Sequence, residues 1–173
     1  MNKQIFIING SGGVGKDTFV ELVSKMFPLS VMNFSSVDKV KEIARIIGWT
    51  GGKTERDRKF LSDLKLLCTD YNNMPFNSMR EKVKEFTKSN AAMLFLHIRE
   101  PEEIEKARVA FGAKTVLIKR DAVKHITSNM ADGNVFNYQY DIIVDNDGNL
   151  EDFNKKAIQF VEDFKSGKMK SNY

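Results

Sequence analysis

Short apolar runs alternate along the chain with longer segments in which apolar residues recur every three or four positions. Continuous apolar runs are typical of strands buried on both faces of a sheet, and the 3.6-residue period is typical of amphipathic helices. The pattern predicts strands at residues 4–9, 30–34, 92–96, 115–118 and 141–144. It predicts helices at residues 16–26, 37–47, 55–71, 76–87 and 102–111, and a last helix from residue 150.

Several predicted helices begin at residue pairs with the spacing of N-terminal caps. The pairs are Ser35 with Asp38, Thr54 with Asp57, and Asn149 with Asp152. In a capping box the first side chain accepts a hydrogen bond from the backbone N–H three residues on, and the second side chain accepts one in return. These pairs therefore indicate where three of the helices start.

The order of elements predicts the fold class. Alternating strands and helices indicate an α/β chain whose parallel sheet is covered by helices on both faces. Three consecutive helical patterns break the alternation between residues 36 and 90, and residues 120–139 are polar and irregular. We expect a single domain over residues 1–173, with a helical insert at about 36–90 and a lid segment at about 120–139. Ligands bind at the carboxyl ends of the strands in such sheets, so residues that follow the strands are the first site candidates.

Composition narrows the class of protein only a little. The 173 residues, 42% of them hydrophobic, suffice for one sizeable core. The apolar segment at residues 5–8 is too short for a membrane helix or a secretory signal, so we expect no membrane partner. The single cysteine, Cys68, fits a reducing, cytoplasmic setting. The net charge of +4 suits an anionic partner, but alone it does not decide between nucleic acid and a small phosphorylated molecule.

A glycine-rich segment follows the first predicted strand and precedes a predicted helix. Residues 10–18 read Gly-Ser-Gly-Gly-Val-Gly-Lys-Asp-Thr and satisfy the pattern Gly-x4-Gly-Lys. Glycines let the backbone turn its N–H groups around phosphate oxygens, and the helix adds its positive N-terminal end. Lys16 is expected to reach the β- and γ-phosphates of a bound nucleotide. The candidate nucleotide-binding residues of this phosphate loop are Gly10, Gly12, Gly13, Val14, Gly15, Lys16, Asp17 and Thr18.

Asp17 departs from the common form of this motif. Most such loops have Ser or Thr after the lysine, where the hydroxyl helps to hold Mg²⁺. Here the hydroxyl comes one residue later, at Thr18. Asp17 is a candidate metal ligand, directly or through water. An acid in the first turn of a helix also complements the helix dipole, and both roles are compatible.

Other sequence features exclude two classes of phosphate-loop protein. The first class is the GTPases, whose guanine-reading Asn-Lys-x-Asp motif is absent here. The second is the motor and transport ATPases, in which an apolar strand ends in a metal-binding aspartate. The candidate strand here ends instead in His97-Ile98-Arg99. The remaining small class is the metabolite kinases, which phosphorylate a small acceptor. The expected fold is accordingly the three-layer fold of P-loop NTPases, with a five-stranded parallel sheet between helices.

The sequence resembles the phage-type deoxynucleoside monophosphate kinases, with the animal-type phosphomevalonate kinases as near relatives. The resemblance rests on Gly-Lys-Asp at residues 15–17, the segment 34–42, the stretch 96–103 around Arg99, residues 112–120 and residues 140–148. It runs in order over most of the chain and is loose between residues 48 and 90. His97 is a departure, because the family reads Ser-Asp-x-Arg where this chain has Leu-His-Ile-Arg.

The resemblance implies an ATP-dependent enzyme that uses Mg²⁺ and transfers the γ-phosphoryl group to a (deoxy)nucleoside monophosphate. A small-molecule acceptor, no nucleic acid, and a monomer or homodimer are expected. The catalytic candidates are Lys16, Arg99, which follows a strand, and Arg120, which begins the lid. Asp145 and Asn146, after the last strand, are candidates for contact with the adenine. The candidates for acceptor binding are Lys41, Arg45, Arg56, His97 and Arg99.

Two alternatives stay open from the sequence. A kinase of another small metabolite, such as phosphomevalonate or dephospho-coenzyme A, shares the expected scaffold and differs in the insert. Trp49, Tyr71 and Phe76 could stack on a base, which would favour a nucleotide acceptor, or could belong to the core. The second alternative is a nucleotide-binding protein without transferase activity, for which His97 is the main support.

Overall fold

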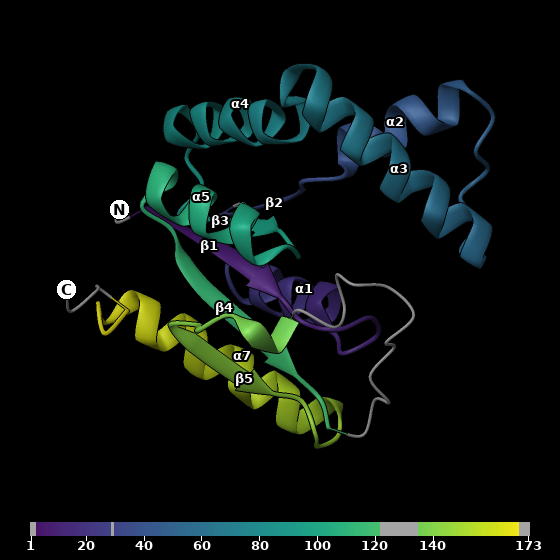
Figure 1. Cartoon of the computed structure of the whole chain (residues 1–173). Coiled ribbons are helices and arrows are strands. Elements are labelled where there is room, and N and C mark those ends of the chain that lie inside the picture. The colour runs from purple at the N-terminus through teal and green to yellow at the C-terminus, as the bar shows by residue number, and fades with distance from the viewer. Residues whose placement is uncertain (1–2, 29, 122–134, 170–173) are drawn as a thin grey trace. The chain divides into compact units, whose positions relative to one another are not determined.

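The computed structural model describes residues 3–28, 30–121 and 135–169. The chain divides into two compact units, one formed by residues 1–33 together with 90–173 and the other by residues 34–89 (Figure 1). The second unit covers most of the segment in which the sequence predicts a helical insert. That this segment binds an acceptor stays a prediction.

The centre of the first unit is a five-stranded sheet with the strand order β2-β3-β1-β4-β5. The strands are β1 (Gln4–Asn9), β2 (Val31–Ser35), β3 (Met93–His97), β4 (Lys114–Lys119) and β5 (Ile142–Asp145). Each lies within one residue of the predicted range at both ends. β1 pairs in parallel with β3 and β4, and β4 with β5, as the alternation of strands and helices predicted.

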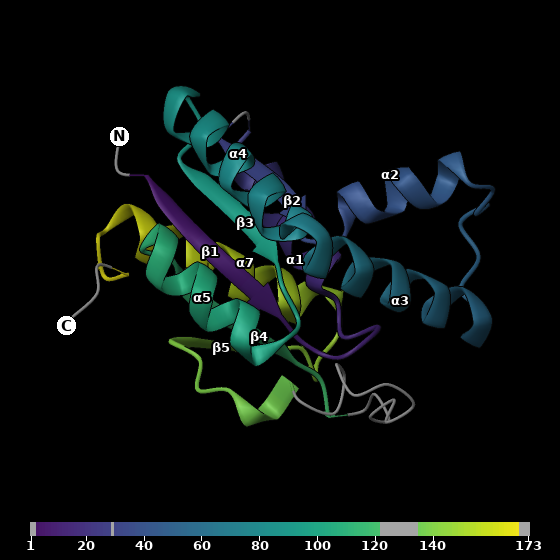
Figure 2. The same cartoon turned by 45° about the horizontal axis from the view of Figure 1, so that its top comes forward.

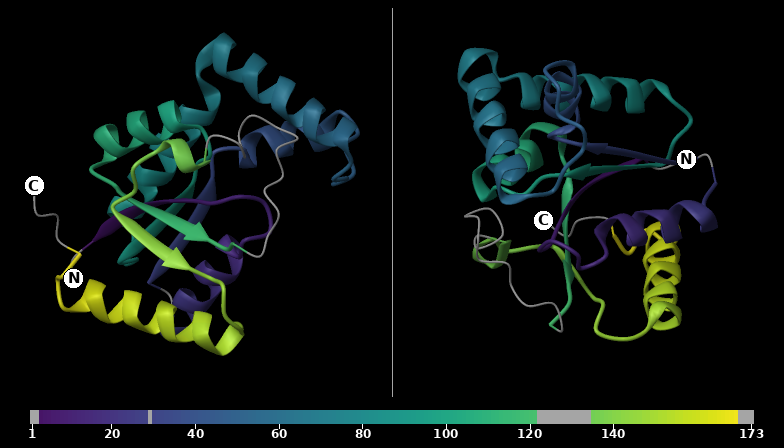
Figure 3. Two further views of the ribbon diagram at one scale, coloured as in Figure 1. Left: turned by 60° about the horizontal axis from the view of Figure 1, so that its bottom comes forward. Right: turned by 90° about the vertical axis from the view of Figure 1, so that its right-hand side faces the viewer.

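Helices cover both faces of this sheet. α1 (Lys16–Met26) and α7 (Leu150–Lys165) pack side by side on one face, and α5 (Pro101–Phe111) packs on β1 and β4 from the other (Figures 2 and 3). Phe6 and Ile8 of β1 belong to the core with α1 and α7, whereas the intervening Ile7 is fully buried outside that core. Alternate side chains of β1 therefore meet apolar surroundings on both faces, which explains the continuous apolar run.

Aromatic rings fill the core beneath α1 and α7. The Phe160 ring of α7 lies 5.0 Å from Phe6 of β1 and 5.2 Å from Phe19 of α1, measured between ring centroids. Tilted and edge-on arrangements at these distances are the favoured ones for aromatic pairs. This cluster fixes α1, and with it the phosphate loop that enters α1, against the sheet.

Two helices begin earlier than the pattern predicts, each at a proline-containing first turn. α4 runs from Met74 to Lys88, two residues ahead of the expected start, and α5 begins at Pro101. Proline is tolerated in the first turn because its missing N–H would have no partner inside the helix. Asn73, with a φ of 55°, turns the chain between α3 (Glu55–Asn72) and α4.

The unit of residues 34–89 consists of α2 (Asp38–Ile46), α3 and α4, which pack on one another (Figure 1). Thr54 and Asp57 form the complete capping box that the spacing predicts. The Ser35–Asp38 pair forms only half of one. The Asp38 carboxylate accepts from the Ser35 N–H at 2.8 Å, but the Ser35 hydroxyl faces the Val37 N–H instead of the Asp38 N–H.

The three aromatic residues that the sequence offers for stacking on a base differ in exposure. Phe76 is buried, so it belongs to the core of the unit. Tyr71 is 86% exposed, and the Trp49 ring lies under the Arg45 guanidinium at 5.5 Å. Tyr71 is thus the one at the surface, whereas Trp49 is half-buried.

The predicted lid at 120–139 is described only at its two ends. Residues 120 and 121 follow β4, and a 3-10 helix, η1, spans Val135–Asn137. Residues 122–134 lie outside the described residues. The described helices include none that is long and apolar enough to cross a membrane.

Candidate active site

The phosphate loop joins β1 to α1 at the carboxyl edge of the sheet. Three of its glycines have positive φ values that side chains rarely adopt: 148° at Gly10, 80° at Gly13 and 101° at Gly15. Gly15 is the N-cap of α1, so the loop leads directly into the first turn of that helix. A Cβ atom on Gly10 would stand 2.4 Å from the carbonyl oxygen of Ile118, which shows how closely the loop lies on the end of β4.

Lys16 lies over the mouth of its own loop. Its Nζ donates hydrogen bonds to the carbonyl oxygens of Gly10 and Ser11, the latter at 2.9 Å. The lysine charge is therefore held at the place where the motif would put phosphate oxygens. An incoming phosphate would exchange these carbonyl partners for charged ones, and hydrogen bonds between charged groups are the stronger kind.

Asn146 supports the loop from below. Its side chain is 8% exposed, and its Nδ2 donates to the carbonyl oxygen of Val14 at 2.8 Å. Its backbone N–H donates to the carbonyl oxygen of Lys119 at 2.7 Å. The sequence marks Asn146 as a candidate for adenine contact, but its amide is directed at the loop. Asp145 is exposed, and its carbonyl oxygen accepts from Lys156.

Asn9 is a second buried amide at the base of the loop, and the sequence reasoning missed it. It is 1% exposed, and its Oδ1 accepts from the Gly10 N–H at 2.8 Å. Its Nδ2 donates to the carbonyl oxygen of Arg99 and to the Tyr140 hydroxyl. The available signal was a polar residue that ends an otherwise apolar strand immediately before the glycine-rich segment.

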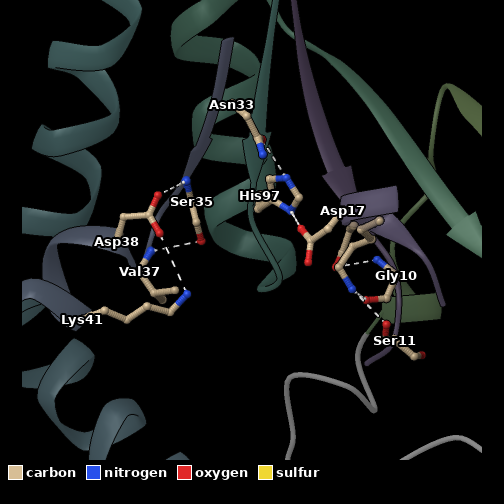
Figure 4. Close-up of polar contacts among 11 residues, drawn as sticks. Gly10, Ser11, Asp17, Asn33, Ser35, Val37, Asp38, Lys41 and His97 are labelled. Atoms are coloured by element: carbon tan, nitrogen blue, oxygen red, sulfur yellow. Dashed lines mark hydrogen bonds and ion pairs between the residues drawn. The ribbon is translucent and has the colours of Figure 1, made fainter. Parts of the chain in front are cut away.

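Asp17, His97 and Asn33 form a line of polar side chains next to the loop (Figure 4). The His97 Nε2 lies 2.8 Å from the Asn33 Oδ1, and its Nδ1 lies 3.8 Å from the Asp17 Oδ1. The His97 side chain is 14% exposed, whereas that of Asp17 is 88% exposed. Because the Asn33 oxygen can only accept, it holds the proton of a neutral imidazole on Nε2 and directs Nδ1 toward the carboxylate. The sequence did not single out Asn33.

Buried polar atoms without partners mark the same edge of the sheet. Among the described residues, three buried side-chain atoms have no hydrogen-bond partner: the Ser11 Oγ and the Arg120 Nε at this edge, and the Trp49 Nε1 in the unit of residues 34–89. Ser11 lies in the loop after β1, and Arg120 follows β4, which pairs directly with β1. Buried polar groups are paired in the great majority of native structures, so each orphan requires an explanation, such as a ligand.

The remaining site candidates are more exposed. Arg99 follows β3 with an exposed side chain, and its carbonyl oxygen is fixed by Asn9 at 3.2 Å. Within the unit of residues 34–89, the Lys41 Nζ lies 3.9 Å from the Asp38 Oδ1, and Arg45 and Arg56 are exposed. The assignment of Lys41, Arg45 and Arg56 to an acceptor stays a prediction.

The metal prediction rests on Asp17. Nowhere in the described part of the chain do three or more His, Cys, Asp or Glu side chains gather as a metal site. A single exposed carboxylate beside the phosphate loop fits a Mg²⁺ ion that takes its other ligands from nucleotide phosphates and water. The role of Asp17 stays a prediction.

These features define the class of protein. A five-stranded parallel sheet in the order 2-3-1-4-5, helices on both faces, and a glycine loop with lysine after β1 make up the P-loop fold of the nucleoside monophosphate kinase type. The predicted fold class is thus confirmed.

The comparison with solved structures finds this fold in small-molecule kinases. A shikimate kinase from Aquifex aeolicus is 13% identical, with a TM-score of 0.51 over 92% of this chain and 97% of the other. A gluconokinase from Sinorhizobium meliloti is 13% identical, with a TM-score of 0.50 over 99% and 98%. The tunicamycin resistance protein from Deinococcus radiodurans is 11% identical, with a TM-score of 0.59 over 94% and 96%. No protein-family model and no curated protein sequence matches the chain.

Proposed function

We propose that this protein is an ATP-dependent kinase that transfers the γ-phosphoryl group to a small acceptor. The phosphate loop carries the proposal: three glycines with positive φ lead into α1, and Lys16 is held over the loop carbonyls. The unpartnered Ser11 Oγ and Arg120 Nε support it, because a bound anion would supply the missing partners. The names of the shikimate kinase and the gluconokinase add support for the reaction class.

The proposed mechanism is positioning and neutralisation of charge, which is most of what phosphoryl transfer requires. Lys16 moves from the carbonyl oxygens of the loop to the β- and γ-phosphates. Arg120, at the end of β4, stabilises the transferred group, and Arg99 holds an acceptor phosphate through its planar guanidinium. Mg²⁺, when bound beside Asp17, supplies further positive charge to the β- and γ-phosphates.

For the acceptor, we propose a (deoxy)nucleoside monophosphate. The support is the sequence resemblance, the position of Arg99 after β3, and the exposed cations Arg45 and Arg56. The phosphate of such an acceptor presents an anionic oxygen, so no general base is needed to remove a proton from the attacking oxygen. Tyr71 and Trp49 are the residues left to contact a nucleobase.

A second acceptor class is favoured by one contact. The Asp17 carboxylate lies 3.8 Å from the His97 Nδ1, next to the donor lysine. A carboxylate in that place is suited to accept the proton that an alcohol loses as its oxygen attacks phosphorus. A small hydroxylated acceptor would use this pair, and a nucleoside monophosphate would not.

A coupled assay for ADP release separates these possibilities. The acceptor panel contains nucleoside and deoxynucleoside monophosphates, phosphomevalonate, dephospho-coenzyme A, and hydroxylated acids such as gluconate and shikimate. ADP release that depends on one monophosphate supports the lead proposal, and release that depends on a hydroxylated acid supports the second class. ATP binding without stimulation by any acceptor would contradict kinase activity toward the panel.

Matched variants identify the donor site in the same assay. Lys16→Ala is expected to reduce kcat by about 10²–10³, the usual effect of losing a preorganised charge-stabilising group. Lys25→Ala removes an exposed lysine from the last turn of the same helix and is the control. Equal activity of the two variants would contradict the assignment of Lys16.

A further inference from the structure

A buried hydrogen-bond network lies beneath the phosphate loop and joins three segments of the chain. Its centre is Asn9, the last residue of β1, which is 1% exposed. Its partners come from the phosphate loop, from the segment after β3, and from the residues that precede β5. We infer that Asn9 and Tyr140 are positioning residues that hold the phosphate loop for nucleotide binding. This inference rests on the proposed function.

The orientation of the Asn9 amide is determined by its surroundings. Its Oδ1 accepts from the Gly10 N–H at 2.8 Å, and its Nδ2 donates to the Arg99 carbonyl oxygen at 3.2 Å and to the Tyr140 hydroxyl at 2.7 Å. The reverse orientation would place the amide oxygen against the Arg99 carbonyl and the NH₂ group against an N–H. Both NH₂ hydrogens and the oxygen are therefore in use, and the side chain has one favourable arrangement.

The Tyr140 hydroxyl extends the network by one step. It donates to the carbonyl oxygen of Val135 at 2.8 Å, and Val135 is fully buried. That carbonyl can only accept, so the phenolic proton lies toward Val135 and the phenolic oxygen accepts from Asn9. Burial raises the pKa of Tyr140 to about 12, consistent with a hydroxyl that keeps its proton for this bond.

The network sets where the phosphate loop begins. The Gly10 N–H is occupied by Asn9, so this amide is turned into the protein while the chain continues into the loop at a φ of 148°. The same side chain fixes the backbone of Arg99, the proposed acceptor residue. One amide thus links the candidate donor loop to the candidate acceptor residue within the same unit. Without the Tyr140 hydroxyl, the Asn9 amide keeps only its bonds to Arg99 and Gly10 and is held less firmly against the loop.

A pair of tyrosine variants tests the inference. Tyr140→Phe removes the central hydroxyl and keeps the ring, and Tyr138→Phe does the same to a tyrosine two residues earlier. The Tyr138 hydroxyl donates to Glu105 at an exposed site and makes no hydrogen bond to Asn9. The measurements are isothermal titration with a non-hydrolysable ATP analogue and hydrogen exchange of the Gly10 amide. Both are made well below the unfolding temperature of each variant, determined by circular dichroism.

Tyr140→Phe is expected to raise the Kd of the ATP analogue about tenfold and to speed exchange of the Gly10 amide, as loss of a positioning hydrogen bond predicts. Tyr138→Phe is expected to leave both unchanged. A purely structural role would lower the unfolding temperature and leave the Kd of the folded protein as in the control. That result would overturn the inference.

Asn9→Ala and the double variant with Tyr140→Phe complete a mutant cycle. If the two residues act together, the double variant weakens binding of the ATP analogue no more than Asn9→Ala alone. Additive losses would overturn the pairing of the two residues. Binding by the wild-type protein is measured first. If the wild type binds no ATP analogue, the proposed function fails. If the wild type binds the analogue and Tyr140→Phe binds it equally well, only the role of Tyr140 fails.

Discussion

Gly10→Ala tests how tightly the phosphate loop is fitted to the sheet. The new Cβ would stand 2.4 Å from the Ile118 carbonyl oxygen and 2.8 Å from the Val14 Cγ2. The first contact is with backbone of β4, which cannot move away as a flexible side chain could. Gly13 is the matched position: its φ is also positive, at 80°, but a Cβ there meets no atom within 4 Å.

Both substitutions strain the backbone, and only Gly10→Ala adds a steric collision. Placing alanine at a positive φ that side chains rarely adopt costs about 1–3 kcal/mol at either position. The collision at Gly10 adds about 1–3 kcal/mol, the usual cost of forcing extra atoms into a packed site. The gain from reducing the freedom of the unfolded chain is the same for both alanines and cancels in the comparison. We therefore expect Gly10→Ala to lower the free energy of unfolding by about 1–3 kcal/mol more than Gly13→Ala.

Urea denaturation followed by far-ultraviolet circular dichroism measures this difference. Fluorescence is the poorer probe, because the only tryptophan, Trp49, belongs to the unit of residues 34–89 while Gly10 belongs to the other. Equal losses of unfolding free energy for the two variants would refute the close packing of the loop on β4. A larger loss for Gly13→Ala would refute it more strongly.

Three further predictions concern the site and its surroundings. Arg120→Ala is expected to lower kcat by about 10²–10³ in the ADP-release assay, because a cation beside the transferred group is lost. Asn146→Ala is expected to lower the unfolding free energy by about 1–3 kcal/mol in urea and to weaken ATP-analogue binding, because a buried loop carbonyl loses its donor. Arg108→Ala is expected to raise the pKa of Glu105 from about 2 toward 4.5, as followed by carboxyl NMR titration. Since the folded-state pKa is lowered, the interaction of Glu105 stabilises the fold above pH 4.5, and this contribution is lost as pH falls toward about 2.

Each of these predictions has a control on a neighbouring residue. Lys119→Ala removes a neighbouring cation, and the Lys119 Nζ pairs with Asp121. The kcat of Lys119→Ala is expected to stay above that of Arg120→Ala. Asn149→Ala removes the N-cap of α7 at a cost of about 1 kcal/mol without touching the loop, so ATP-analogue binding should persist. Tyr138→Phe should raise the pKa of Glu105 less than Arg108→Ala does, because Tyr138 is the lesser cause of its lowering.

The sheet and helices could be predicted because the relevant signals are local. Runs such as residues 5–8 and 92–96 are apolar throughout, Thr54 and Asp57 form a complete capping box, and the Asn149 side chain accepts from the Asp152 N–H as its spacing predicts. Ser35 shows the limit of such signals. Its spacing to Asp38 is correct, yet its hydroxyl turns to the Val37 N–H, because α2 begins at Asp38, two residues later than a complete box needs.

The phosphate loop could likewise be predicted, but the residues that hold it could not. Asn9 and Asn146 are 137 positions apart in the sequence, counting from 9 to 146, and both direct an amide at the loop. The local signals, a polar end to an apolar strand for Asn9 and a position after the last strand for Asn146, place both residues near a site but do not show that their amides hold the loop. Their roles depend on β1, β4 and β5 lying next to one another, which only the sheet order reveals. The same holds for Asn33, whose contact with His97 spans two strands.

The two departures from the usual patterns, the exposed Asp17 and the largely buried His97, make none of the hydrogen bonds by which Asn9 and Asn146 hold the loop. The side chains that anchor the loop, Asn9 and Asn146, are 1% and 8% exposed, whereas the Asp17 side chain is 88% exposed and faces His97. Substitutions at Asp17 or His97 therefore leave the anchors of the loop in place. The consequence is a division of effects: changes at Asn9 or Asn146 should alter nucleotide affinity, and changes at Asp17 or His97 should alter the metal or acceptor requirement. If the proposed function holds, a variant of His97, where the resembled family has Asp, should therefore change acceptor use in the ADP-release assay and leave the Kd of the ATP analogue unchanged.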